Sequence, residues 1–402
     1  MKLLTFSTLY PNSEKQHHGI FTETSLRHLL AHPEVSAKVV APIPWFPFKN
    51  SAFGQYAFFA RASRKQTRLG IDIVHPRFAL VPKVGMVLTP FLMAMAVKPA
   101  IQRIIDDGFD FDVIDAHYFY PDGVAAIILG RHFKKPVVIK ALGTDLNLIL
   151  QSALPRKMIL WAARHAAGMS SVCEALKTEL VKLGVSSDRV TVLRNGVDLE
   201  LFKPVDRVAM RRQLGFEHFT LLSVGLLTPR KAHDLIIRAL PLLPDVRLVI
   251  AGGGTDLKTL TDLAIELKVD SRVRFVGGLP QQELRNYYGA ADALVLASSR
   301  EGWANVLLES MACGTPVVAS NVWGTPEVVS TPEAGVLMPE RTPSGIADGV
   351  NALRANYPTN DSTRRYAERF SWEEPTRLQL EMFERILGKP DAMAGVKPVE
   401  KS

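Results

Sequence analysis

Two glutamates, Glu301 and Glu309, lie eight positions apart in the segment EGWANVLLESMACGTP. The apolar runs ALVLAS (293–298) and TPVVAS (315–320) flank this segment and predict two buried strands. A loop and a helix are therefore expected between the strands, at the edge of a parallel sheet where ligands bind. Two carboxylates at that edge could accept hydrogen bonds from sugar hydroxyls. The spacing of the two glutamates has a second interpretation. Glu309 could simply stabilise the N-terminal end of the helix, and Glu301 could be a surface residue without a ligand.

The predicted helix begins near Asn305. The amides of Asn305, Val306 and Leu307 would then be N–H groups without a partner inside the helix. Such groups lie at the positive end of the helix and favour an anion. The segment therefore predicts a phosphate site that the two glutamates flank.

Two adjacent cations, Arg230 and Lys231, follow the apolar run FTLLSVG (219–225) and open the next helical segment. Cations at the start of a helix are unfavourable unless an anion compensates their charge. A nucleotide diphosphate would supply that anion, and both side chains would then stabilise charge on the leaving group. The alternative is a solvated basic pair.

Other candidate residues also stand at the ends of predicted strands. His117 ends the run DVIDAH and either faces the ligand-binding edge of the sheet or is a satisfied core histidine. Asp145 follows the run PVVIKAL and either orients an acceptor hydroxyl or caps a turn. Gly19, in the first strand-to-helix loop, lets the backbone approach a diphosphate or a sugar. Gly277 ends the run VRFVG, where backbone groups could read the edge of a nucleobase.

Cofactor and metal signatures are absent from the sequence. The triplet Gly252–Gly254 lacks the third glycine of a dinucleotide fingerprint, since Leu257 stands there. His17 and His18 have no third ligand at a suitable spacing, and no Asp-x-Asp pair stands at a strand end. We therefore expect no cofactor and no metal requirement.

Twelve runs rich in valine, isoleucine and leucine alternate with segments of helical periodicity. This alternation predicts an α/β protein with parallel sheets covered on both faces. Because a strand, a loop and a helix open at Met1 and again at Phe219, we expect two Rossmann-like domains in tandem. The twelve runs lie at residues 2–6, 37–42, 112–117, 136–142, 168–172, 190–195, 219–225, 246–252, 273–277, 293–298, 315–320 and 334–338.

Turn signals divide the chain near Asn195–Pro204. We predict one domain over 1–196 and a second domain over 197–370. A C-terminal helix is expected over 371–388, and the tail 389–402 is expected to be mobile.

The composition is that of an average soluble enzyme, with 47% hydrophobic and 22% charged residues. It excludes disordered, collagen-like and coiled-coil chains. The two cysteines, Cys173 and Cys313, cannot form a disulfide framework and predict reduced thiols. The longest apolar stretch, 84–97, contains a proline and is too short to span a membrane, and no export signal is visible. A cytoplasmic protein is expected.

Positive charge is concentrated in the first half of the chain. Residues 1–190 hold 23 lysines and arginines against 14 acids, a net charge of +9, and the remainder carries −1. Such asymmetry predicts an acidic partner, and no nucleic-acid-binding module is found. Basic residues at 61–68 beside aromatic residues at 53–59 favour contact with an anionic membrane surface, so that the protein would be peripheral on the inner face of the plasma membrane. The alternative is a solvated basic face.

The segment EGWANVLLESMACGTPVVAS, with its E-x7-E spacing, resembles the signature of the family 4 retaining glycosyltransferases, which have the GT-B fold. Similar pieces stand in the expected order, over about residues 1–388. They are HHGIFTETSLRHL, DVIDAHYFYPDG, KALGTDLN, VLRNGVDLELFKP, VGLLTPRKAHDLIIRAL, VRFVGGLPQQELRNYYGAADALVLAS and WGTPEVV. The N-terminal pieces look like members that build exported bacterial polysaccharides of the exopolysaccharide or teichuronic-acid type.

The resemblance implies roles for residues already singled out. Glu301 would hold the sugar hydroxyls and Glu309 the ribose, while Gly225 begins the donor-phosphate loop. His117 would contact the donor sugar and stabilise the transition state. The implied reaction is retaining hexosyl transfer from a nucleotide-diphosphate sugar, as co-substrate, to a saccharide or lipid-linked saccharide.

The resemblance also implies the role of each domain. The domain over 1–196 would bind the acceptor, and the domain over 197–370 would bind the nucleotide sugar. The helix over 371–388 would cross back to the first domain.

The sequence departs from the family pattern at two places. Leu226 stands where many relatives carry an arginine, and Gly19 is preceded by His18 rather than by a second glycine. A sugar-nucleotide epimerase on the same fold and a non-catalytic partner of another transferase remain as alternatives.

Overall fold

The computed structural model describes residues 1–80 and 85–388 and divides the chain into two compact units. Unit 1 comprises Met1–Leu193 together with helix α16 (Glu373–Ile386), and unit 2 comprises Arg194–Trp372. The predicted limits, 1–196, 197–370 and 371–388, lie within a few residues of these boundaries. The tail predicted to be mobile, 389–402, lies outside the described residues.

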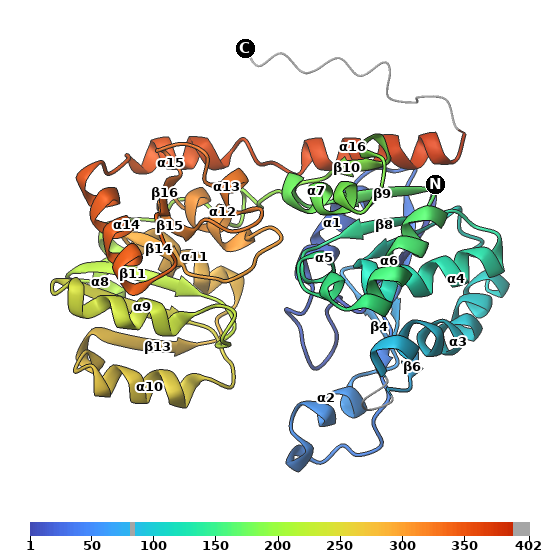
Figure 1. Cartoon of the computed structure of the whole chain (residues 1–402), viewed down its shortest axis with the longest axis horizontal. Helices are drawn as coiled ribbons and strands as arrows, with labels where there is room; N and C mark the ends of the chain where they lie inside the picture. The colour runs from blue at the N-terminus through green and yellow to red at the C-terminus, as the bar shows by residue number, and fades with distance from the viewer. Residues whose placement is uncertain (81–84, 389–402) are drawn as a thin grey trace. The chain divides into compact units, whose positions relative to one another are not determined.

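Unit 1 is built on an eight-stranded sheet with the strand order β10-β9-β8-β7-β1-β2-β5-β4. Every pairing is parallel except that of β4 with β5. Helices α3, α4 and α6 contact one another, and α16 contacts α1 (Figure 1). The strands are β1 (Lys2–Phe6), β2 (Ser36–Val40), β4 (Lys65–Arg68), β5 (Ile71–Val74), β7 (Val113–His117), β8 (Val137–Ala141), β9 (Gly168–Ser171) and β10 (Val190–Val192). The helices are α1 (Ile20–Leu30), α2 (Gln55–Arg61), α3 (Gly85–Asp106), α4 (Val124–Phe133), α5 (Thr144–Asn147), α6 (Ala153–His165) and α7 (Glu174–Lys182).

Unit 2 has a parallel six-stranded sheet with the order β13-β12-β11-β14-β15-β16. Helix α9 contacts α10 and α14, whereas α11 contacts α8 and α12. The strands are β11 (Phe219–Val224), β12 (Val246–Ala251), β13 (Val273–Gly277), β14 (Ala293–Leu296), β15 (Val317–Ser320) and β16 (Gly335–Met338). The helices are α8 (Arg207–Leu214), α9 (His233–Ala239), α10 (Leu257–Glu266), α11 (Gln281–Ala290), α12 (Asn305–Ala312), α13 (Thr325–Val328), α14 (Pro343–Ala355) and α15 (Asn360–Ala367).

All twelve predicted runs contain a strand, and the expectation of two doubly wound α/β units is confirmed. The sequence analysis missed four short strands, β3 (Ile43–Pro44), β4, β5 and β6 (Arg77–Phe78). These strands are two to four residues long, and their polar or proline-containing sequences lack the apolar runs of buried parallel strands. Of the apolar stretch 84–97, residue 84 lies outside the described part, and the rest begins α3. Within the parts of the chain that the structure describes, no helix is both long and apolar enough to cross a membrane.

Each sheet reverses its strand order at one point. In unit 1 the chain moves outward from β1 to β2 and later returns to β7 on the other side of β1. In unit 2 it moves from β11 to β12 and β13 and returns to β14 beside β11. Loops after the two strands at such a reversal diverge and leave a crevice at the carboxyl edge, where ligands bind in open α/β sheets.

Helix α16 is part of the core of unit 1 although it lies at the far end of the sequence. Its side chains Leu380, Met382 and Phe383 pack in one cluster with Leu3, Leu29, Val113 and Val138. This burial holds the C-terminal helix against strands that form near the N-terminus.

We predict that Phe383→Ala lowers the free energy of unfolding by about 3–5 kcal/mol, because the fully buried ring leaves a cavity in this cluster. Arg377→Ala, on the exposed side of the same helix, should cost no more than about 0.5 kcal/mol, since it removes only a surface ion pair. Urea unfolding of both variants tests this. Equal effects of the two substitutions would contradict the assignment of α16 to the core.

Candidate active site

The carboxyl edge of the unit 2 sheet brings together three charged residues that the sequence analysis singled out. Lys231 Nζ lies 2.6 Å and Arg230 Nη1 3.2 Å from the same oxygen, Oε1, of Glu301. The Ser299 amide donates to the Arg230 carbonyl at 2.9 Å, which joins the loop after β14 to the loop after β11. These two loops flank the reversal of strand order in this sheet.

The electrostatics of this cluster favour a further anion. The Glu301 side chain is 9% exposed and that of Lys231 is 12% exposed, so their charges interact with little solvent screening. Burial acts to raise the pKa of Glu301, but the charges of Lys231 and Arg230 hold it below its ordinary value. One carboxylate faces two cations, so the cluster carries one uncompensated positive charge at the ligand-binding edge.

Glycines allow the loop after β11, which is the candidate phosphate-binding loop, to pack closely against the loop after β12. Gly225 has a φ of 152°, and a Cβ there would lie 3.1 Å from Cε of Lys231. A Cβ at Gly252 would lie 1.8 Å from the Gly225 carbonyl oxygen, and one at Gly254 would lie 2.3 Å from that of Leu227. The Gly252–Gly254 triplet therefore allows two loops to touch backbone to backbone, which is a packing role and not that of a dinucleotide fingerprint.

Gly277 continues this row of loops. It is exposed, has a φ of 72°, and accepts a hydrogen bond from the Gly252 amide at 2.7 Å. The backbone of Gly252 therefore contacts Gly277 on one side and Gly225 on the other, at one edge of the sheet. Leu226, at the position where the family resemblance leads us to expect an arginine, follows Gly225 and is 63% exposed.

Helix α12 begins at Asn305, as predicted. The Asn305 and Val306 amides occupy its first two positions, which have no partner within a helix. The expectation for Leu307 is wrong, because its amide donates to the Ala304 carbonyl at 3.0 Å and closes the first turn. The Asn305 carboxamide accepts from Asn195 at 3.4 Å, and the Trp303 indole donates to the Asn195 carbonyl at 3.0 Å.

Glu309 lies on α12 with a partner that the sequence analysis missed. The Tyr288 hydroxyl donates to Glu309 Oε2 at 2.8 Å. Burial raises the pKa of Glu309 to about 7, although the tyrosine hydrogen bond acts in the opposite direction. The tyrosine comes from α11, and the segment RNYYGA offered no spacing that pointed to Glu309. With a pKa of about 7, the Glu309 carboxyl is partly protonated at neutral pH. The protonated form can both donate a hydrogen bond to a hydroxyl group and accept one from it.

His117 is buried in unit 1, with 2% of its surface exposed. Its Nε2 lies 3.0 Å from Asp115 Oδ2, and Gln379 on α16 donates to the same oxygen at 3.2 Å. This is the geometry of a satisfied core histidine, the alternative that the sequence left open. Residues two apart on a strand face the same side, so the pattern Asp-x-His was the available signal for this pair. Lys140 on β8 is also buried, which lowers its pKa to about 8 against the opposing effect of Asp115.

Asp145 has the geometry of a turn-capping residue. Its carboxylate is fully buried and accepts from the amides of Phe119 at 2.8 Å and Gly143 at 2.7 Å. It therefore joins the loops after β7 and β8, and no solvent-facing oxygen is left to orient an acceptor. Burial raises the pKa of Asp145, and the backbone hydrogen bonds act to lower it.

The reversal point of the unit 1 sheet is held by Asp122, which the sequence analysis did not single out. Its carboxylate accepts from both the amide and the hydroxyl of Thr8, the hydroxyl at 2.9 Å. Burial raises the pKa of Asp122 to about 7. Gly19, at the end of the same first loop, has a φ of 68°, and a Cβ there would lie 2.2 Å from the Leu9 backbone. Gly19 is thus required for the loop to fold back on itself.

No metal site is found among the residues that the structure describes, since no three His, Cys, Asp or Glu side chains converge there. His17 and His18, considered above as ligands, have no third partner of these types in residues 1–80 and 85–388.

We predict a pH-dependent loss of stability from Glu309. Its folded-state pKa is raised from 4.5 to about 7, so the carboxyl is preferred in its protonated form in the folded protein. Relative to Glu309→Gln, the wild type should therefore lose up to about 3 kcal/mol of unfolding free energy as the pH rises from 4.5 through 7. Urea unfolding of both proteins across this range measures the difference. Glu200→Gln, at a side chain that is 96% exposed, is the control and should show no such trend.

Two family models match the chain. The model described as Glycosyl transferases group 1 matches residues 206–370, and the model described as Glycosyltransferase Family 4 matches residues 77–201. The first therefore covers most of unit 2, and the second covers much of unit 1.

Relatives with assigned names match only part of the chain. It is 35% identical over 208 residues to the D-inositol 3-phosphate glycosyltransferase of Mycobacteroides abscessus, covering 50% of this chain and 47% of that protein. It is 36% identical over 229 residues to the protein of the same name from Saccharomonospora viridis, covering 52% and 53%. The chain thus spans about half the length of the curated relatives it matches.

Solved structures match the chain over almost its whole length. The HepE protein of Anabaena in complex with UDP aligns with a TM-score of 0.72 and 20% identity, covering 96% of this chain and 100% of that one. Sucrose-phosphate synthase from Thermosynechococcus elongatus aligns with a TM-score of 0.76 and 18% identity, covering 96% and 99%. These alignments show that the chain has the GT-B fold. The two family models, which together match most of the chain, show that it belongs to the group 1 and family 4 glycosyltransferases.

Proposed function

We propose that the chain transfers a hexosyl group from a nucleotide-diphosphate sugar to a saccharide or lipid-linked saccharide, with retention of anomeric configuration. The observation that carries this proposal is the cluster of Arg230, Lys231 and Glu301 at the reversal point of the unit 2 sheet. A buried carboxylate with two cations suits a ligand that has an anionic part beside a hydroxylated part. A sugar joined to a diphosphate has both.

The diphosphate is assigned to Lys231 and Arg230. Both cations contact Glu301 Oε1, so a bound diphosphate would share them with the carboxylate. Charge that develops on the leaving diphosphate as the sugar bond breaks would then be stabilised by groups already in place. The amides of Asn305 and Val306 at the start of α12 would add a second positive region.

Glu301 and Glu309 are assigned to the hydroxyl groups of the donor. The Oε2 oxygen of Glu301, opposite the one that faces the cations, would accept from the sugar. Glu309, with Tyr288 behind it, would hold the ribose, and the backbone beside Gly277 would contact the base. UDP is the first nucleotide to test, because the HepE structures are described as complexes with UDP and with UDP-glucose.

In unit 1 we assign His117 to the core, because its buried ring is held by Asp115. Asp145 is assigned only to holding its loop. We also propose that the acceptor is presented at an anionic membrane surface, because the excess positive charge of the chain lies in its first half. The corresponding role is in cell-surface polysaccharide synthesis on the cytoplasmic side.

A thermal-shift panel of UDP, GDP and ADP, followed by their sugar conjugates, tests the donor site. A ligand that binds only the folded state raises the melting temperature, and one base is expected to stand out. No response to any nucleotide by the folded protein would favour the non-catalytic alternative. Conversion of the donor sugar to an epimer without acceptor would favour the epimerase alternative.

Two substitutions separate binding from transfer. Lys231→Ala should abolish the thermal response to the nucleotide, because it removes the more buried cation. Glu301→Gln should keep that response, since both cations then lack their carboxylate, but should lower the transfer rate by about 100-fold or more. The matched controls are Lys258→Ala and Glu200→Gln, whose side chains are 86% and 96% exposed. Full transfer activity in Glu301→Gln would contradict the assignment of this carboxylate.

A further inference from the structure

Positive charge is enriched in one segment of unit 1. Residues 35–105 contain ten lysines and arginines and a single acid, Asp72, a net charge of +9. Three of these cations are ion-paired, Lys38 with Asp72, Arg61 with Glu14 and Arg68 with Glu23. The remaining cations supply the positive field of this segment, and residues 131–177 add a further net charge of +6 elsewhere in the unit.

The same segment exposes large apolar side chains. Exposed aromatic residues gather before and on α2, where the Phe46 ring centre lies 5.5 Å from those of Phe53 and Tyr56. The Phe48 and Phe53 rings stack with their centres 5.0 Å apart. We call this group the aromatic cluster, and its exposed members are Trp45, Phe48, Phe53, Tyr56 and Phe58, between 36% and 56% exposed.

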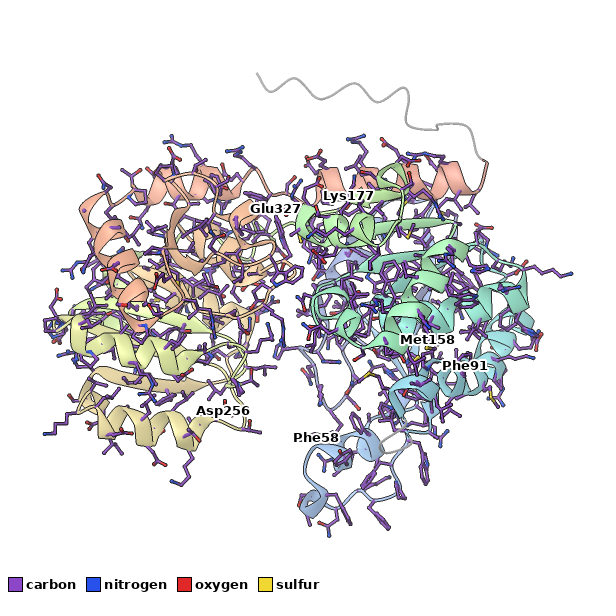
Figure 2. The ribbon with its side chains drawn as sticks, in the orientation of Figure 1. Phe58, Phe91, Met158, Lys177, Asp256 and Glu327 are labelled. Carbon is purple, nitrogen blue, oxygen red and sulfur yellow. The ribbon has the colours of Figure 1, made fainter. Side chains whose placement is uncertain are left out.

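The first half of α3 also exposes large apolar side chains. Its side chains Met86, Leu88, Phe91 and Met95 are between 41% and 72% exposed. Figure 2 labels Phe58 on α2 and Phe91 on α3, both in unit 1. Exposed apolar and aromatic groups combined with basic residues are typical of a surface that rests in the interface of an anionic membrane.

A cavity of about 310 Å³ lies between α2 and α3 and has a polar part and an apolar part. The polar part comes mainly from the loop after β1, with Thr89 from α3, and it includes Thr8, which is bound to Asp122 at the reversal point of the sheet. The apolar part includes the exposed Phe58 and Leu80, so the cavity reaches the surface described above. The lining residues divide into a polar set, Thr8, Asn12, Lys15, His18 and Thr89, and an apolar set, Pro42, Ile43, Pro44, Phe58, Phe59, Ala62, Phe78, Leu80 and Pro121.

Lys15 gives the polar part its charge. Its ammonium lies 5.7 Å from the centre of the Phe58 ring and 5.5 Å from that of Phe59. The cation is therefore held against the aromatic wall of the cavity. No carboxylate is among the lining residues of this cavity. Burial and the charge of Lys15 both lower the pKa of His18, which favours its neutral form there.

We propose that this cavity binds the acceptor as a lipid phosphate. In this arrangement the phosphate lies at Lys15, and the first part of the apolar chain runs past Phe58 and Leu80 into an anionic bilayer on which the aromatic cluster rests. The inference rests on the proposed transfer to a lipid-linked saccharide and names the part of the acceptor that is recognised. A lipid suits the site better than a protein partner because the Lys15 cation, an apolar wall and exposed aromatic groups occur together at one amphiphilic cavity.

The cavity is tested with farnesyl phosphate, farnesol and inorganic phosphate, each titrated into the full chain by calorimetry. Farnesyl phosphate should bind about tenfold tighter than either of the others, because only it has both an apolar chain and a charged group. Lys15→Ala and Leu80→Asp should each weaken that binding about tenfold. Lys182→Ala and Leu154→Asp, at exposed side chains elsewhere in unit 1, are the matched controls and should bind as the wild type does.

The membrane surface is tested by sedimentation with vesicles of phosphatidylcholine containing phosphatidylglycerol. Binding should be strong at low salt and weak at high salt. The double variant Trp45→Ser with Phe53→Ser should lose vesicle binding but keep farnesyl phosphate binding, because neither residue lines the cavity.

The outcomes separate this inference from the proposed function. Absence of farnesyl phosphate binding, or equal binding by Leu80→Asp, would overturn the lipid cavity while the nucleotide response could still stand. Absence of vesicle binding at low salt would overturn the membrane surface and favour a protein partner there. If the wild-type protein binds farnesyl phosphate but shows no thermal shift with UDP or the other nucleotides, the proposed function would be overturned instead. The assignment of the cavity to an acceptor would then be overturned with it.

Discussion

The arrangement of the donor-site candidate depends on one ionic contact, the carboxylate of Glu301 with Lys231 and Arg230. It joins two loops that are 70 residues apart in sequence and lie on either side of the reversal in strand order. Breaking a buried ion pair leaves an uncompensated charge in a low-dielectric site, which is strongly unfavourable. Each of the three side chains therefore restrains the other two, and the excess cation leaves the group suited to an anionic ligand.

Backbone contacts between loops give this cluster its support. Gly225, Gly252 and Gly277 end adjacent strands, and their peptide groups touch without intervening side chains. A side chain at Gly252 would have to overlap the Gly225 carbonyl, so the loop that positions Lys231 could not take its present path. The path of the loop that carries Lys231 thus depends on a glycine, Gly252, at the end of the neighbouring strand.

Unit 1 uses buried carboxylates for a comparable purpose. Asp122 holds the loop after β1 through Thr8, Asp145 holds the loops after β7 and β8 through backbone amides, and Asp115 links His117 to α16 through Gln379. Each carboxylate accepts at least one hydrogen bond, as a buried polar group requires, although Oδ1 of Asp115 has no partner in the described structure. The result is a rigid edge beside a surface segment that is rich in exposed aromatic residues and cations.

The amino-acid sequence by itself determined the two α/β units, their twelve principal strands and the candidate donor cluster, because apolar periodicity and the placement of charges after strands are local features. It could not distinguish the alternatives for His117 and Asp145, since these depend on Gln379, which bonds the Asp115 partner of His117, and on Phe119, which only the fold brings near. The amide of Leu307 was also decided by the turn geometry at Ala304. The cavity at Lys15 combines loops and helices from residues 8 to 121, and no sequence pattern records which of their faces converge. Tertiary packing decides such sites because they depend on distances between segments that are remote along the chain.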